Sequence, residues 1–299
     1  QSDAMADRDA ALETVWGEKG KPGTVYVEKG DYTSMATTLS GAVTVLGALN
    51  KPVRVIGQEN PEDVIFRYAA NDTGGGVAVS DPEASICGVT FIGTSKASTD
   101  SDCTRGMAIH LTDGLVSNCV ITACDCKGSR SQPFFSIYSG VMTHCAVTNN
   151  KHTINNAYAR GGMIGYLSGG TLRRTHILRN NMTYADQAQT SGLMVEGGTV
   201  EDCRITGNKY GNNINQACGI GITLNGEKAV CRRCIIDRNK GSNGVNNDRG
   251  GGVHGVKGLL ESCLVCFNTN KYAGGISIGS GSYTASNFKI RNCTVYGNV

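Results

Sequence analysis

The sequence predicts an all-β protein, a parallel β-solenoid, and three observations lead to that class. One pattern of about 30 residues returns eight times, its repeats contain short strands without a helical period, and the spacing between corresponding positions varies. A unit this short cannot bury its own apolar face, so the units must stack on one another. Stacked strands would lie about 4.8 Å apart along the axis, and turns of variable length would absorb the differences in spacing.

The composition agrees with a folded β-rich chain and excludes several classes of protein. The 299 residues include 41 glycines but only 5 prolines, which excludes collagen and proline-rich linkers. With 28 Lys and Arg against 25 Asp and Glu, the net charge of +3 is too small for a dedicated nucleic-acid binder. No apolar run reaches the roughly 18 residues of a transmembrane helix, so no membrane-spanning segment is expected.

The start of the chain is expected to form a capping helix. Met5, Leu12 and Trp16 share one stripe of a helix that would stop near Gly17. Such a helix would cover the open end of the solenoid, where core and strand edge are otherwise exposed.

Three segments of one domain follow from these patterns. Residues 1–22 hold the capping helix, and residues 23–70 alternate apolar and polar residues as entry strands and first coils. Residues 71–299 carry the regular repeats, so we expect eight coils there and two more from the preceding segment.

Each repeat consists of a glycine-rich opening, a short apolar strand, a turn and a second strand. The second strands align on an anchor position that is cysteine in six of the eight repeats, and the position five residues later is asparagine in six. An aliphatic residue two positions after the anchor faces the same side of the strand. The anchors are Gly88, Cys119, Cys145, His176, Cys203, Cys234, Cys263 and Cys293, and the later positions are Gly93, Cys124, Asn150, Asn181, Asn208, Asn239, Asn268 and Asn298.

The two aligned positions predict two ladders along the solenoid. Stacked asparagines can pass side-chain amide hydrogen bonds from coil to coil and satisfy groups that burial would otherwise strand. The cysteines are expected to behave as small buried hydrophobes, and His176 as a core histidine with a hydrogen-bond partner.

Zinc and disulfides are the alternatives for the cysteines. Cys231-x-x-Cys234 and Cys263-x-x-Cys266 have the spacing of zinc ligands, but residues three apart in a strand point to opposite faces, so we expect no metal. Stacked positions lie within the Cα distance of a disulfide, although parallel side chains are poorly aimed for one. We therefore expect mostly free buried thiols, with one or two bridges among the loop cysteines.

Two motifs resemble known families. The runs Gly23–Tyr32 (GTVYVEKGDY) and Lys51–Gly57 (KPVRVIG) resemble the N-terminal entry of the right-handed parallel β-helix, or pectin-lyase-like, superfamily. Phe267-Asn268-Thr269-Asn270, followed by Gly274-Gly275-Ile276, is similar to the rungs of polymorphic outer-membrane and autotransporter-like bacterial surface proteins. The first resemblance implies a right-handed β-helix over essentially the whole chain. Because that superfamily hosts lyases, glycosidases, adhesins and tailspikes, the fold alone does not give the function.

Signals for catalysis are few. A glycosidase needs two neighbouring carboxylates, and the pairs Asp100/Asp102 and Glu201/Asp202 do not resemble the motifs of β-helical polygalacturonases. A lyase needs a basic residue near the α-proton of a uronate, often with calcium, but no acidic calcium cluster is visible. The candidates for that chemistry are Lys240, Arg249 and His254. No cofactor is expected, with calcium reserved for the lyase alternative.

The strongest polar feature is a set of cations beside the asparagine ladder, with lysines after it and arginines at the same strand ends. Stacking of the coils would align them along one edge as a positive stripe. The stripe could bind an acidic polysaccharide, or it could be a solvated edge whose like charges discourage aggregation. Its members are Lys151, Arg179, Lys209, Arg238, Lys240 and Lys271.

Two hypotheses for the function follow. The first is a secreted or cell-surface β-helix with a structural, adhesin or glycan-binding role and no catalytic site. The second is a polysaccharide lyase or glycoside hydrolase acting on an acidic polysaccharide. The sequence ends directly after Asn298 without a capping segment, so we also expect a longer natural chain or a protein partner at this end.

Overall fold

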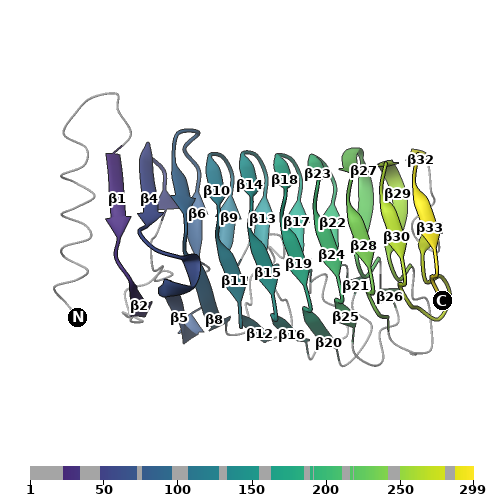
Figure 1. Ribbon diagram of the computed structural model, residues 1–299, viewed down its shortest axis with the longest axis horizontal. Coiled ribbons are helices and arrows are strands. Elements are labelled where there is room, and N and C mark those ends of the chain that lie inside the picture. The colour runs from purple at the N-terminus through teal and green to yellow at the C-terminus, as the bar shows by residue number, and fades with distance from the viewer. Residues whose placement is uncertain are drawn as a thin grey trace.

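The computed structural model describes residues 23–33, 48–72, 76–95, 107–127, 133–154, 163–184, 189–190, 192–210, 216–217, 219–241, 250–279 and 287–299. These residues form one right-handed parallel β-helix, so the predicted fold class is confirmed (Figure 1). The predicted capping helix over residues 1–22 lies outside the described residues. Within the described part of the chain, no helix is long and apolar enough to cross a membrane.

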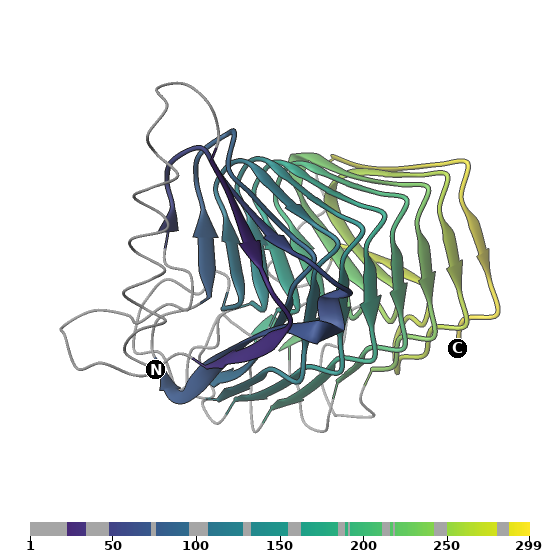
Figure 2. The same cartoon turned by 60° about the vertical axis from the view of Figure 1, so that its left-hand side comes forward.

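Successive strands of each coil fall into four rows that run along the axis (Figure 2). Row 1 follows the glycine-rich openings and contains β3 (Ala48–Leu49), β6 (Val77–Val79), β9 (Ile109–Leu111), β13 (Phe135–Ile137), β17 (Gly165–Leu167), β22 (Leu193–Val195), the first parts of β27 (Ile222–Arg232) and β29 (Val253–Glu261), and β31 (Ile276–Ile278). Row 2 contains β1 (Gly23–Val27), β4 (Val53–Gly57), β7 (Ser85–Cys87), β10 (Leu115–Ser117), β14 (Val141–Thr143), β18 (Thr171–Arg173), β23 (Thr199–Glu201), the second parts of β27 and β29, and β32 (Asn287–Arg291).

The second strand of each predicted repeat lies in row 3, and a short row 4 follows it. Row 3 contains β2 (Gly30–Thr33), β5 (Val64–Asp72), β8 (Thr90–Ser95), β11 (Val120–Thr122), β15 (Ala146–Thr148), β19 (His176–Leu178), β24 (Arg204–Thr206), β28 (Ile235–Asp237), β30 (Leu264–Cys266) and β33 (Thr294–Tyr296). Row 4 contains β12 (Asp125–Lys127), β16 (Lys151–Ile154), β20 (Asn181–Tyr184) and β25 (Lys209–Tyr210). A separate pair joins β21 (Gln189–Thr190) to β26 (Gln216–Ala217), and the 3₁₀ turn η1 spans Pro61–Asp63.

The strands pair in parallel and in register, so like positions stack. In row 2, for example, Val116 pairs with Met142, which pairs with Leu172 on the following coil. These inward side chains are fully buried and form one continuous core with those of the other rows. Burial of such aliphatic columns is the main favourable contribution to the fold.

Left-handed residues make two sharp corners in each regular coil. Between rows 2 and 3 they include Asn118, His144, Arg174, Asp202, Arg233, Ser262 and Asn292, with φ between 45° and 54°. Between rows 3 and 4 they include Ala123, Asn149, Arg179, Gly207, Arg238, Phe267 and Gly297. The residue that follows each of these corners is the ladder residue, which is cysteine at the first corner except for Thr175 and asparagine at the second except for Cys124.

Corner geometry corrects the predicted register in one repeat. The residue after Arg174 is Thr175, which is buried and accepts a hydrogen bond from the backbone N–H of Cys145 at 3.4 Å. His176 is therefore exposed rather than a core histidine. The asparagine ladder likewise runs through the buried Asn180, and the predicted Asn181 is exposed.

The first repeat shows a similar shift of one residue. Gly88 is the left-handed corner residue, with φ 72°, and the buried Val89 follows it. Val120 pairs with Thr90, which places Cys119 opposite Val89. The anchor of this repeat is therefore Val89.

Candidate functional site

The predicted basic stripe exists as a connected surface feature along the corner between rows 3 and 4. Lys151 begins β16 and Lys209 begins β25, while Asn181 pairs with both across the coil between them. Lys240 extends this column by parallel bridges to Lys209 and to Thr269. The stripe therefore carries exposed cations on successive or alternate coils. Neighbouring coils are about 4.8 Å apart along the axis.

The remaining members of the stripe lie beside this column. Arg179 and Arg238 are left-handed corner residues, a position that turns their side chains away from the core. Lys271 lies two residues beyond Thr269, with its Nζ 5.3 Å from the centre of the Tyr272 ring.

Most of these charges lack an acidic partner. Within the described residues, Lys151, Arg179, Lys209 and Lys240 form no ion pair. Arg238 pairs with the buried carboxylate of Asp237 and lies over the Phe267 ring, with Cζ 5.9 Å from the ring centre. An exposed row of unpaired cations creates a local positive potential that an anionic polymer could neutralise.

A second charged cluster lies at the corner between rows 2 and 3 and is internally neutralised. Glu201 accepts hydrogen bonds from Arg232 at 2.8 Å and from Arg233 at 3.0 Å, and Asp202 accepts one from Arg233 at 2.7 Å. Hydrogen bonds from Arg232 lower the pKa of Glu201, and those from Arg233 lower the pKa of Asp202. A general acid needs a raised pKa, so this predicted carboxylate pair is unsuited to glycosidase chemistry.

Of the three candidate residues for catalysis, the structure describes Lys240 and His254 and places them in different rows of the coil. Lys240 is exposed on the stripe, whereas His254 lies in row 1, fully buried, with its Nδ1 2.8 Å from the Ser277 hydroxyl. Arg249 lies outside the described residues, as do Asp100 and Asp102.

A polar and aromatic cluster on the outer side of row 1 was missed from sequence. His110 Nδ1 lies 2.7 Å from the Ser136 hydroxyl, and its ring meets Tyr138 edge to face at 5.3 Å. Tyr138 lies 5.8 Å from Tyr166, which donates a hydrogen bond to Glu196 Oε2 at 2.7 Å. The signal was hidden because the two tyrosines occupy different positions of the repeat. We call these five residues the row 1 cluster.

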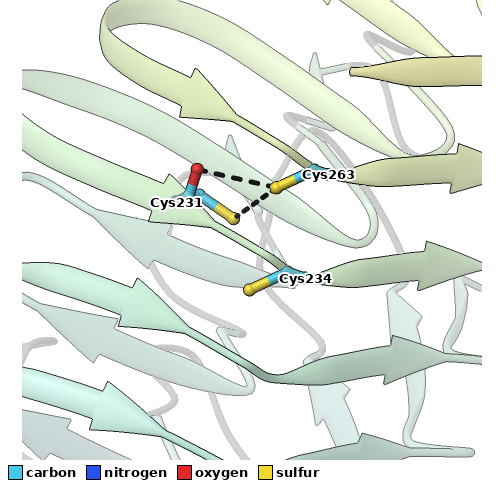
Figure 3. A group of neighbouring side chains, drawn as sticks. All are labelled: Cys231, Cys234 and Cys263. Carbon is cyan, nitrogen blue, oxygen red and sulfur yellow. Dashed lines mark hydrogen bonds between the residues drawn. The ribbon is translucent and has the colours of Figure 1, made fainter. Parts of the chain in front are cut away.

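Three thiols meet in the core, contrary to the expectation that a C-x-x-C pair would divide between two faces. The sulfurs of Cys231, Cys234 and Cys263 lie within 4.8 Å of one another, and all three residues are buried (Figure 3). The expectation was wrong because Arg233, with φ 53°, bends the chain between Cys231 and Cys234. The bend turns both side chains inward.

The coils, corners and stripe together define a right-handed parallel β-helix with a basic edge. No family model matches the sequence, and no curated protein matches it significantly.

Solved structures resemble this chain at 10% sequence identity. A mannuronic acid specific polysaccharide family 6 lyase from human gut microbiota gives a TM-score of 0.37 over 98% of this chain and 89% of its own. The A-module of an Azotobacter vinelandii mannuronan C-5 epimerase gives 0.41 over 98% and 91%. The catalytic unit of an α-1,3-glucanase from Streptomyces thermodiastaticus gives 0.27 over 98% and 66%. At these scores the resemblances carry no functional information.

Proposed function

We propose that this chain is an exported or cell-surface β-helix that binds a linear acidic polysaccharide along its basic stripe without cleaving it. The observation that carries the proposal is the column through Lys151, Lys209 and Lys240, whose exposed charges have no acidic partner within the described residues. A rigid coil repeat holds these cations in a straight line. A linear polyanion with regularly spaced carboxylates can therefore contact several of them at once, and several weak contacts add to a useful affinity.

The energetics favour a weak, salt-sensitive interaction. Each exposed ion pair contributes about 0.2–1 kcal/mol, so three of them supply roughly 0.6–3 kcal/mol. Charges separated by more than about 10 Å are screened at 0.1 M salt, so the affinity should fall as ionic strength rises.

The test is binding of the full chain to polygalacturonate, alginate and chondroitin sulfate by calorimetry. We expect the triple variant Lys151→Gln/Lys209→Gln/Lys240→Gln to bind about tenfold more weakly than the wild type. The matched control replaces Lys51, Lys228 and Lys289, which are exposed in or beside row 2, and should lose far less. An equal loss of affinity in both triple variants would show that binding depends on net charge and not on the stripe. If the wild type bound none of the polymers, the proposal would be refuted.

A second candidate function, a polysaccharide lyase, is favoured by the row 1 cluster alone. Histidine, tyrosine and glutamate are side chains that transfer protons, and Tyr166 already shares a hydrogen bond with Glu196. Under this alternative calcium would be supplied with the substrate in the assay. The described residues contain no cluster of three acidic ligands that would hold it.

The lyase alternative is tested by the ultraviolet absorbance of the unsaturated product during incubation with the same polymers, with and without calcium. A rise that Tyr166→Phe and His110→Gln abolish would place catalysis at the row 1 cluster. A rise abolished instead by Lys240→Ala would place the base on the stripe. Flat traces from folded protein that still binds would leave the binding function standing alone.

A further inference from the structure

One position in the inward-facing column of row 2 differs in residue type from all the others. Strand pairing aligns Cys231 of β27 with an inward column that is otherwise aliphatic or methionine. Cys231 is therefore the only thiol of this column within the described residues, and it is fully buried. The other members of the column are Val25, Val55, Ile86, Val116, Met142, Leu172, Val200, Leu260 and Ile290.

That single change places a thiol against the cysteine ladder of the next coil. Cys231 Sγ lies 3.9 Å from Cys263 Sγ, and Cys263 Sγ also lies 3.6 Å from the carbonyl oxygen of Cys231 (Figure 3). Cys231 pairs with Leu260 rather than with Cys263, so the two cysteines approach diagonally across the corner. Stacked ladder residues such as Cys234 and Cys263 project side by side, whereas this diagonal pair converges.

The surroundings of the three thiols disfavour a metal ion. Metal binding requires thiolates, and three thiolates would place negative charge among buried side chains. Contacts with Cys234 and Cys263, together with burial, raise the pKa of Cys231 well above its usual value. The pKa of Cys263 is lowered by its hydrogen bond to Cys231 but raised more strongly by Cys234 and burial, to about 12. The nearest guanidinium groups, on Arg232 and Arg233, are engaged with Glu201 and Asp202 outside the core.

We propose that Cys231 and Cys263 are a redox pair that closes a disulfide between adjacent coils when the protein folds in an oxidising medium, with Cys234 remaining a thiol. The bond adds no charge to the core. Each thiol loses its proton and one electron to a disulfide oxidant such as oxidised glutathione, which is reduced to two thiols. The sulfurs must approach from 3.9 Å to about 2.05 Å, which side-chain rotation of the converging pair can supply. This inference is independent of the polysaccharide proposal.

Trypsin separates the cysteines of this cluster. Cleavage after Lys228, Arg232, Arg233, Arg238, Lys257 and Lys271 puts Cys231, Cys234 and Cys263 on peptides 229–232, 234–238 and 258–271. The full chain is refolded in a glutathione redox buffer, alkylated under denaturing conditions without reduction, digested and analysed by mass spectrometry. We expect peptides 229–232 and 258–271 to be joined and two hydrogens lighter than their sum, with Cys234 alkylated. Fragment ions distinguish Cys263 from Cys266 within the last peptide.

Alternative results would overturn the proposal. Full alkylation of Cys231 and Cys263 would show free thiols, and a link to Cys234 would show a different pair. Stoichiometric zinc or copper in the purified full chain, measured by elemental analysis, would show a metal site instead.

A stability measurement supplies a second readout. Cys231→Val restores the aliphatic column and should fold, but it removes the crosslink. Reduction should lower the melting temperature of the wild type by several degrees and leave that of Cys231→Val unchanged. The control Cys203→Thr alters the ladder outside the cluster and should keep the sensitivity to reduction. A wild type whose melting temperature is insensitive to reductant would contradict the proposal.

Discussion

The two corners of each coil use different side chains to satisfy buried backbone carbonyl and N–H groups. Asparagine does so at one corner and cysteine at the other. At the corner between rows 3 and 4, Asn180 Nδ2 donates to the Val147 carbonyl and to Asn208 Oδ1, both at 2.9 Å. At the corner between rows 2 and 3, the Cys145 thiol donates a hydrogen bond to the Thr143 carbonyl at 3.2 Å. Its contact with the Val116 carbonyl is longer, at 4.0 Å. The amide ladder is thus a chain of short, cooperative bonds, and the thiol ladder is a chain of weak ones.

This difference predicts how strongly each ladder responds to substitution. The cysteine ladder accepts a hydroxyl at Thr175 and an aliphatic side chain at Val89, because little hydrogen bonding is lost there. The asparagine ladder is unbroken from Asn150 to Asn298, and Cys124 and Gly93 take its place on the two coils before Asn150. Burial with contact to Cys145 raises the pKa of Cys119 well above its usual value, so the thiol stays protonated and remains a donor. We therefore expect the amide corner to be the less replaceable of the two.

The largest expected effect is the loss of one ladder asparagine. Asn180→Ala removes the side-chain partner of the Val147 carbonyl and of the backbone N–H of Asn150. It also removes one hydrogen bond from each of the side-chain amides of Asn150 and Asn208, which keep their bonds to the Ile121 carbonyl and to the backbone N–H of residue 180. At about 1–3 kcal/mol for each unsatisfied buried group, the free energy of unfolding should fall by roughly 4 kcal/mol or more in urea titrations. Asn181→Ala, one residue along and exposed, should change it by less than about 0.5 kcal/mol. An equal loss of unfolding free energy in the two variants would contradict the assignment of the buried ladder position to Asn180.

A smaller effect is expected where a buried polar group beside the asparagine corner is only partly satisfied. His152 Nε2 donates to the Met163 carbonyl at 3.0 Å, and Nδ1 has no partner within the described residues. Burial lowers the pKa of His152 to about 3. Because the unfolded chain binds the proton with the ordinary pKa of about 6.5, the stability is fully present above pH 6.5 and is lost as the pH falls toward 3.

This linkage predicts a pH-dependent difference between two variants of the chain. From pH 7 to pH 5 the wild type should lose about 2 kcal/mol through His152. His152→Met, which matches Met182 on the next coil, should remove that part of the loss. Urea midpoints at the two pH values measure it. A variant with the same loss as the wild type would assign the acid sensitivity to other groups.

The repeat itself was predictable because its signals are local. Glycine openings, period-two strands and ladder residues at a fixed offset appear directly in the sequence and gave the fold class and the basic stripe. The register failed at Thr175 and Asn180 because Ile177 and Leu178 are both aliphatic and Asn180 and Asn181 are both asparagine, so two alignments were equally regular. The left-handed Arg174 decides between them, and only the backbone reveals it.

The contacts that were not predicted depend on geometry between coils. The row 1 cluster joins residues from different repeat positions, such as Tyr138 and Tyr166, across loops of unequal length. The meeting of Cys231 with Cys263 requires a corner bend that a period-two pattern does not contain. Sequence periodicity therefore predicts columns within a row, while contacts across a corner need the coil itself.

The smallest expected effect tests whether the cysteine ladder needs its sulfur. Cys145→Thr places on one coil the residue that Thr175 already supplies on the next, where the hydroxyl donates to the Arg173 carbonyl at 2.9 Å. Its unfolding free energy should therefore stay within about 0.5 kcal/mol of the wild type, whereas Cys145→Ala removes the donor and leaves a small void at a cost of about 1–2 kcal/mol. Urea titrations of the two variants side by side give the difference. If threonine cost as much as alanine, the ladder would depend on the size and polarisability of sulfur, and the weak hydrogen bonds would not be its basis.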